Sequence, residues 1–139
     1  MNFDPTGQLT ARLRRNGLRP TRQRIHLASL LLDGRHRHVS PDDIYDQLKS
    51  GPEKLSRGTV YNTLRQFCDA GLLCEVHGVG DTLVYDTNLH NHHHFLNVET
   101  GELTDIEQDT VQIGHLPDLP EGYEMDAVEL TIRIRKSSQ

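Results

Sequence analysis

The sequence predicts an α+β fold in two parts, helical in its first half and built from strands in its second half. Apolar residues recur at helical spacing up to about residue 70, and alternate with polar residues after it. The charge divides at the same place. Residues 1–70 hold 12 Lys and Arg against 7 Asp and Glu, and residues 71–139 hold 3 against 13. A basic half can lie on phosphates while an acidic half collects cations, although two solvated surfaces explain the same split equally well.

The length and composition exclude several classes of protein. A chain of 139 residues with 35% hydrophobic content fits one domain or two small ones, not a large multidomain enzyme. It contains no apolar run of about 18 residues and no basic-then-apolar leader, so we expect a cytoplasmic protein without a membrane span. Cys68 and Cys74 are not in a C-x-x-C arrangement and are expected to be buried thiols in a reducing compartment.

Four amphipathic segments predict helices in the first half. The first covers about residues 6–16 and is closed by Gly17. The next three begin after residues that can cap a helix and stop at glycine or at a Ser-Gly-Pro run: after Thr21, after Ser40 and after Ser56.

The fourth predicted helix is the candidate for insertion into a DNA groove. Val60, Leu64 and Phe67 form its apolar stripe, and the residues on its other faces carry hydroxyl, amide and guanidinium groups. Such groups on an exposed helix suit base edges and phosphates. Any one of them alone would more often be an ordinary surface residue. The candidates are Arg57, Thr59, Tyr61, Asn62 and Arg65.

Two short strands with a turn between them follow the fourth helix. The segments 73–77 and 82–86 alternate in polarity, and Gly78-Val79-Gly80-Asp81 joins them as a hairpin turn. Helices followed by such a hairpin describe a winged helix, so residues 1–87 are predicted to form a winged-helix DNA-binding domain.

Residues 88–139 are predicted to form a small α/β dimerisation and sensing domain with an antiparallel sheet. Alternation predicts strands over 94–98, 102–106 and 129–135, and the proline-rich stretch 116–122 predicts a loop. One apolar sheet face in about 45 residues makes a weak core, which favours a homodimer formed through this half.

Histidines and aspartates gather around residue 90 in a pattern that predicts a transition-metal site. On a strand, His92 and His94 point to one side and His93 to the other. Imidazole and carboxylate together suit Fe(II), Mn(II) or Zn(II). A histidine run without a ligand is the alternative, and the flanking His38, Asp86 and Asp105 argue against it.

The chain resembles the ferric uptake regulator (Fur) family along most of its length. The stretches that carry the resemblance are residues 18–24 (LRPTRQR), 38–40 (HVS), 59–64 (TVYNTL), 70–72 (AGL) and the His92-x-His94 strand. Within the family it looks most like the iron response regulator (Irr) branch, from residues 92–95 (HHHF), from Gly114 followed by Leu116-Pro117, and from residues 120–122 (PEG).

The resemblance implies a homodimeric, metal-responsive transcription regulator that controls iron and haem genes through double-stranded operator DNA. It implies a regulatory metal site at His38, Asp86, His92, His94 and Asp105. His93 and, more distantly, His115 are candidates for a second metal or for haem. The residues expected on DNA with those of the fourth helix are Arg19, Thr21, Arg22 and Arg24.

The sequence departs from the family in two ways. Where many relatives carry a C-x-x-C for structural zinc it has Asn97 and Thr100, so no four-cysteine zinc site is expected. It also lacks the Cys-Pro motif near the N-terminus of some Irr proteins, which leaves the histidine cluster as the only seat for haem.

Three other functions stay open from the residues. The chain could be a manganese-responsive or peroxide-responsive member of the same family, a small metal-dependent enzyme, or a protein interaction module. No general base, nucleophile elbow or phosphate-binding loop accompanies the histidines, so an enzyme is not expected. The effector, the operator sequence, repression or activation, and dimer or tetramer are not specified by these side chains.

Overall fold

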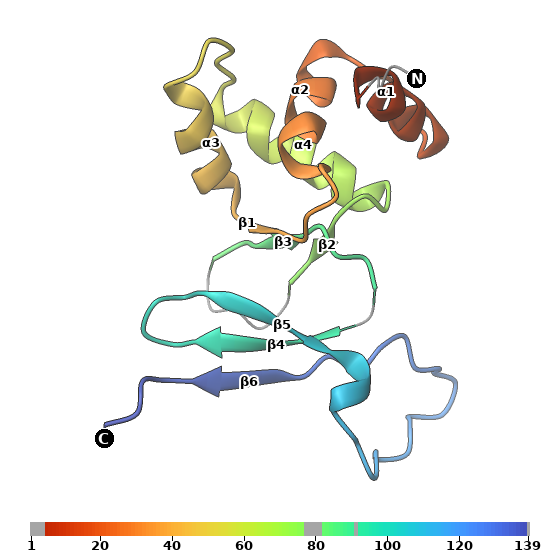
Figure 1. Ribbon diagram of the computed structural model, residues 1–139. Helices are drawn as coiled ribbons and strands as arrows, with labels where there is room; N and C mark the ends of the chain where they lie inside the picture. The colour runs from red at the N-terminus through yellow and green to blue at the C-terminus, as the bar shows by residue number, and fades with distance from the viewer. Residues whose placement is uncertain (1–4, 77–81, 91, 139) are drawn as a thin grey trace. The chain divides into compact units, whose positions relative to one another are not determined.

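The computed structural model describes residues 5–76, 82–90 and 92–138, and divides the chain into two compact units. The first unit extends to Leu89 and the second begins at His90. The first holds helices α1 (Pro5–Arg15), α2 (Arg22–Leu31), α3 (Pro41–Lys49) and α4 (Arg57–Asp69) with strands β1 (His38–Val39), β2 (Cys74–Glu75) and β3 (Tyr85–Asp86). The second holds β4 (His92–Asn97), β5 (Leu103–Glu107), the 3-10 helix η1 (Gln108–Thr110) and β6 (Thr131–Ile134). Figure 1 labels the α-helices and the strands, and the α+β class is confirmed.

Three helices of the first unit begin at the predicted capping residues. The hydroxyls of Thr21, Ser40 and Ser56 accept the amide N–H three residues on, at 3.2, 3.1 and 3.1 Å respectively. After α4, Gly71 takes a φ of +85°, a conformation that glycine adopts without the steric cost of a Cβ. Helix α2 ends three residues before the predicted Gly34, because Leu32 leaves helical geometry at φ −104° and ψ +51°.

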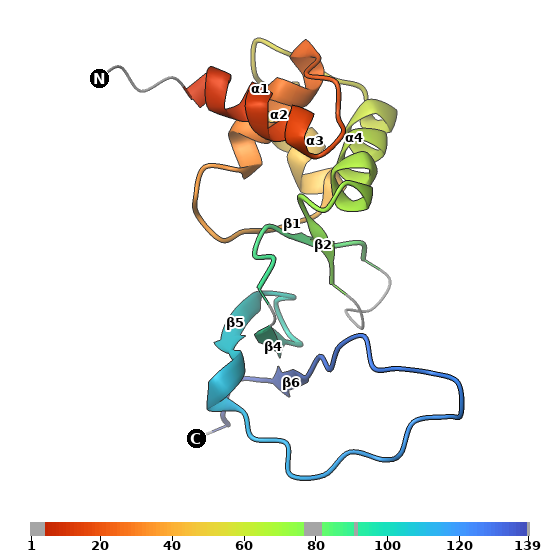
Figure 2. The same cartoon turned by 90° about the vertical axis from the view of Figure 1, so that its right-hand side faces the viewer.

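Leucines and one phenylalanine fill the interior of the first unit. Leu13, Leu27, Leu64 and Phe67 have no exposed surface, and Val60 joins them from the same stripe of α4. Figures 1 and 2 both show the four helices gathered on one side of the short sheet of this unit. Burying the apolar stripe of α4 leaves its polar side chains on the remaining faces.

The sheet of the first unit has the order β1-β3-β2, with both pairings antiparallel. Its strands β2 and β3 are the predicted wing, although they are shorter than predicted, and the predicted turn at 78–81 lies outside the described residues. Strand β1 was not predicted. Its register pairs His38 with Asp86, so the two side chains project from neighbouring positions.

The sheet of the second unit is mixed, with the order β5-β4-β6. Strands β4 and β5 are antiparallel, as predicted, whereas β6 pairs with β4 in parallel. A parallel neighbour needs a long connection, which residues 108–130 supply as η1 and an irregular loop, seen in Figure 2 extending away from the sheet. Among the described residues of this unit η1 is the only helix, since Pro117, Pro120 and two glycines interrupt the loop.

We expect Leu64→Ala to lower the free energy of unfolding by about 2–5 kcal/mol, because Leu64 is completely buried and its loss leaves a cavity. Urea denaturation followed by circular dichroism measures this. Leu119→Ala is the matched control, since Leu119 is 47% exposed and its truncation should change stability by less than about 0.5 kcal/mol. Equal losses for both variants would show that α4 does not anchor the core.

Candidate functional site

Two imidazoles and a carboxylate converge in the second unit. His92 and His94 project from the same face of β4, and Asp105 is the residue of β5 that pairs with His94. The Oδ1 atom of Asp105 lies 3.3 Å from His92 Nε2 and 3.4 Å from His94 Nε2. The two rings are 4.6 Å apart between centroids, and their side chains are only 10% and 11% exposed.

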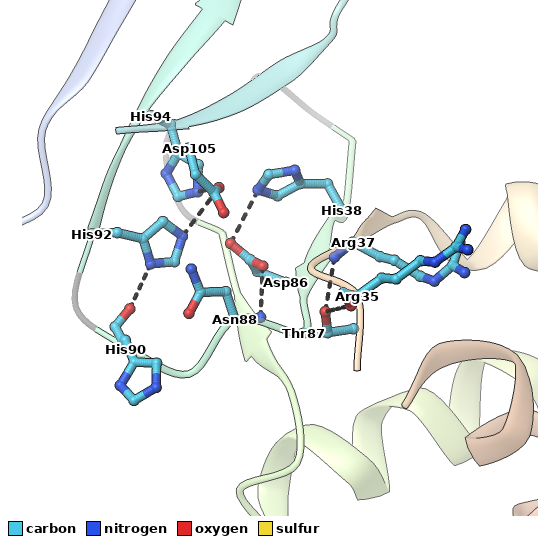
Figure 3. A network of polar contacts seen from close by, with 10 residues as sticks. All are labelled: Arg35, Arg37, His38, Asp86, Thr87, Asn88, His90, His92, His94 and Asp105. Carbon is cyan, nitrogen blue, oxygen red and sulfur yellow. Dashed lines mark hydrogen bonds and ion pairs between the residues drawn. The ribbon is translucent and has the colours of Figure 1, made fainter. Parts of the chain in front are cut away.

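A backbone carbonyl determines which nitrogen of His92 faces this cluster. His92 Nδ1 contacts the carbonyl oxygen of His90 (Figure 3), and because a carbonyl only accepts, Nδ1 carries the proton. The neutral ring then keeps its lone pair on Nε2, which is the atom beside Asp105. This arrangement is the one in which an outer hydrogen bond orients an imidazole for a metal.

A second His–Asp pair lies in the first unit. His38 Nε2 is 3.0 Å from Asp86 Oδ2, and Asp86 is 1% exposed. The other carboxylate oxygen, Oδ1, accepts the N–H of Asn88 at 2.8 Å. A carboxylate this deeply buried is stable only when cations or hydrogen bonds compensate its charge.

Hydrogen bonds around Thr87 hold β1 against β3 next to this pair. Its hydroxyl accepts the N–H of Arg37 at 2.8 Å and donates to the carbonyl of Arg35 at 3.2 Å, as Figure 3 shows. The N–H of Thr87 in turn donates to the carbonyl of Arg37 at 3.0 Å. These bonds and the Asn88 contact are features that spacing in the sequence did not reveal.

Each unit therefore contains donors of the same chemical kind. The predicted ligands offer imidazole nitrogen and carboxylate oxygen, a set that suits Fe(II), Mn(II) or Zn(II) better than Ca(II) or Mg(II). Three donors come from the second unit and two from the first.

His93 has a different environment from its two neighbours. It is 3% exposed, and its Nδ1 accepts the N–H of Leu130 at 3.0 Å, so in the neutral ring the proton is on Nε2. A metal or haem iron at Nδ1 would displace this bond, and one at Nε2 would displace the proton. His115, the other candidate for a second site, is exposed on the loop after η1.

Asn97 and Thr100, the positions compared with a C-x-x-C above, lie at the end of β4 and in the turn that leads to β5. Asn97 Oδ1 accepts the N–H groups of Glu99 and Thr100 at 2.9 and 3.2 Å. The amide of Asn97 thus closes the hairpin through hydrogen bonds. Of the two cysteines, Cys74 is exposed, and Cys68 is half-buried with a pKa raised by that burial.

The predicted DNA contacts of α4 divide into two groups. Asn62 and Arg65 are exposed, and Thr59 bonds through its hydroxyl to Ser56 at 2.8 Å. Arg57 and Tyr61 both contact the carboxylate of Asp42, a residue that was not a candidate from the sequence.

The candidates near α2 are also held by partners within the first unit. Arg22 bonds to Glu53 at 2.6 and 2.9 Å, which lowers the pKa of the Glu53 carboxyl. Arg24 donates to Gln66 at 3.0 Å and to the carbonyl of Arg19 at 2.9 Å. The hydroxyl of Thr21 serves as the cap of α2. Glu53 lies 31 residues from Arg22 along the chain, and Gln66 lies 42 residues from Arg24. No local sequence pattern therefore predicts either contact.

A helical unit with a short sheet, a helix with a buried apolar stripe and exposed polar side chains, and histidine–aspartate pairs are together typical of metal-responsive DNA-binding regulators. The sequence profile of the Ferric uptake regulator family matches residues 15–133, and the chain belongs to that family. It is therefore a metal-responsive transcription regulator and not an enzyme. No helix within the described ranges is long and apolar enough to cross a bilayer.

Relatives of two kinds share this sequence. The ferric uptake regulation protein of Shigella flexneri is 31% identical over 101 residues, which cover 72% of this chain and 68% of that protein. The peroxide-responsive repressor PerR of Staphylococcus aureus is 34% identical over 97 residues, covering 70% and 65% respectively. The matches span about two thirds of the length of these curated relatives.

A solved structure agrees over nearly the whole chain. The ferric uptake regulator from Pseudomonas aeruginosa with manganese superposes with a TM-score of 0.70 at 27% identity, covering 94% of this chain and 98% of that one. The likeness extends through both units of the fold.

We expect His94→Ala to weaken the binding of Mn(II) or Zn(II) by about 100-fold or more, since loss of even an outer-shell partner costs 10–100-fold. Isothermal titration calorimetry of the metal-stripped protein measures this. His36→Ala, which removes an exposed imidazole that is not a candidate ligand, is the control and should bind the metal as the unchanged protein does. If both variants bind equally well, the cluster on β4 and β5 is not the metal site.

Proposed function

We propose that this chain is an iron-responsive operator-binding regulator of the Irr type within the Fur family, active as a homodimer. The observation that carries the proposal is the contact of His92 Nδ1 with the carbonyl oxygen of His90, which leaves Nε2 of His92 as the ring nitrogen beside Asp105 and His94. The His38–Asp86 pair of the first unit offers the same kinds of ligand, and the resemblance to the Fur family extends the proposed metal site to it.

The first unit supplies a route from this site to the DNA. His38 stands two residues before Ser40, which caps α3, and α3 packs against α4. A change in the position of β1 therefore acts on the start of α3, and through it on α4. A divalent ion would be held by His38 and Asp86 of the first unit and by His92, His94 and Asp105 of the second, and it would supply positive charge next to the two carboxylates. An ion held in this way would restrict the angle between the two units.

That restriction has consequences in a dimer. Two α4 helices must enter the major groove at a separation set by the half-sites of the operator, typically one helical turn of DNA. Without the ion this separation would not be fixed, and only molecules whose separation matches the operator would bind specifically. Restricting the angle raises the fraction of molecules that are competent to bind.

Iron is the proposed effector because of the Irr resemblance and the similarity to ferric uptake regulation proteins. Imidazole and carboxylate accept manganese as readily, and the P. aeruginosa relative was solved with manganese. Similarity to PerR supports a peroxide-responsive alternative. These alternatives share the five-residue site and differ in the ion that regulates it.

Haem is the second proposed ligand, and it involves His93. A cavity of about 310 Å³ adjoins His93 and is lined by the side chains of Val111, Ile113, Met125 and Val128 among others. Such a volume is at the low end of ordinary ligand sites. Because Nδ1 of His93 holds the Leu130 amide, haem ligation would require this bond to open.

The uncovered face of the second sheet supports a homodimer. Phe95 and Ile132 pair across β4 and β6, and they are 36% and 38% exposed, with Ile134 at 40%. Within the described residues β6 is an edge strand, so its outer backbone groups are available for another strand. A second copy that covers this face would bury these side chains.

We expect metal to raise operator affinity only when the five ligands are intact. An operator is first selected from random duplex DNA with the metal-loaded protein, and its affinity is then measured while Fe(II), Mn(II) and haem are titrated anaerobically. Fe(II) should tighten specific binding by at least tenfold, with the haem absorption band as a separate readout. The double variant His92→Ala/His94→Ala should lose this response and retain salt-sensitive non-specific binding. A response that persists in the double variant would contradict the proposed site.

We expect Ile132→Asp to convert the dimer to a monomer, because two buried carboxylates would face each other across a two-fold axis. Sedimentation velocity measures the change. Ile113→Asp is the control, since Ile113 is similarly exposed, at 42%, but lies on the loop instead of the sheet. A dimer that survives Ile132→Asp would show that the sheet face is not the interface.

A further inference from the structure

One carboxylate oxygen holds two side chains of the DNA-facing helix. Asp42, in the first turn of α3, accepts through Oδ1 a hydrogen bond from Arg57 Nη1 at 2.7 Å and another from the Tyr61 hydroxyl at 3.0 Å. Arg57 and Tyr61 are four residues apart on α4, so they lie on the same face one turn from each other. Both were expected on DNA from the sequence, whereas Asp42 was not.

The Tyr61–Asp42 bond determines the polarity of the hydroxyl. A carboxylate can only accept, so the single proton of the Tyr61 hydroxyl points at Asp42. The pKa of Tyr61 is raised, chiefly because of this hydrogen bond, which agrees with the phenol as donor. The lone pairs on the hydroxyl oxygen remain, and toward any further partner the group can act only as an acceptor.

Arg57 is held from a second side. Its guanidinium carbon lies 4.8 Å from the centroid of the Tyr45 ring, on the same helix as Asp42. The contacts with Tyr45 and Asp42 together fix the position of the Arg57 guanidinium relative to Tyr61. By contrast, the Arg22–Glu53 pair joins one arginine to one carboxylate and does not involve a residue of α4.

The major groove distinguishes bases by donors and acceptors. Adenine N6 and cytosine N4 carry amino groups that donate, while guanine and thymine present O6 and O4, which accept. An oxygen that only accepts can pair with the amino groups and is repelled by the carbonyl oxygens. A free phenol hydroxyl can turn its proton outward and pair with either kind.

We propose that Asp42 is a positioning residue that determines base preference. Because the Tyr61 hydroxyl donates its proton to Asp42, Tyr61 accepts from adenine or cytosine and disfavours guanine or thymine at one operator position. This proposal rests on the proposed operator binding. Asp42 does not touch DNA in it and acts through Tyr61 and Arg57.

The test begins with an operator selected from random duplex DNA by the metal-loaded protein. Each A·T pair is replaced in turn by G·C, and each C·G pair by T·A, which exchanges the amino donor at that position for a carbonyl acceptor. At one position in each half-site we expect affinity to fall by about tenfold, within the range for a lost base contact. Tyr61→Phe should bind the two DNAs equally, which assigns that position to the hydroxyl.

Asp42→Ala then separates positioning from general binding. It should reduce the discrimination at that position to less than about threefold, since the hydroxyl can then also donate. Glu53→Gln is the matched control. It removes a carboxylate from the Arg22 pair, so it should change affinity for all sequences alike and leave the tenfold preference unchanged. Asp42→Glu, which retains an acceptor, should restore part of the preference.

Two results would overturn the proposal. A tenfold preference that survives unchanged in Asp42→Ala, or a Tyr61-dependent preference for guanine or thymine, contradicts the role of Asp42 while leaving operator binding in place. Failure of the metal-loaded protein to enrich any sequence would overturn the proposed function and this inference with it.

Discussion

The buried carboxylate of Asp86 is the constraint on which the proposed regulation depends. A charge that is 1% exposed needs compensation, and the Asn88 amide and the His38 imidazole supply part of it. Meeting that need fixes β1 against β3, because His38 must lie opposite Asp86. The strand then leads directly into α3. In the proposed regulation, an ion that changed the balance of charge at Asp86 would act on a segment that is continuous with the helices.

Helix α4 combines two requirements along one stretch of chain. Its stripe of Val60, Leu64 and Phe67 must be buried for the first unit to fold, and the residues between them are left outside. Several of these side chains are held in place by hydrogen bonds. Asp42 accepts hydrogen bonds from Arg57 and Tyr61, and Gln66 of α4 accepts one from Arg24. Hydrogen bonds between helices thus orient the polar side chains that the packing of the apolar stripe leaves on the surface of α4.

The His92–His93–His94 run shows how adjacent identical residues acquire different roles. Alternation on β4 sends His92 and His94 toward Asp105 and sends His93 to the opposite face, where it accepts the amide of Leu130. The alternation was readable from the sequence. The partner of His93 was not, because Leu130 approaches only after the chain has crossed over from β5 and joined β4 in parallel. The same crossover turned a predicted antiparallel sheet into a mixed one.

The amino-acid sequence by itself determined the four helices, their caps, the apolar stripe of α4 and the grouping of histidines with aspartates. These features depend on periodicity and on contacts three or four residues apart, so they are legible along the chain. Only the tertiary structure decided the β1–β3 register, the parallel β6, the proton position on His92 and the contacts of Asp42 and Glu53. Each of these depends on groups that are distant in sequence or on backbone carbonyls, whose positions no side-chain pattern specifies.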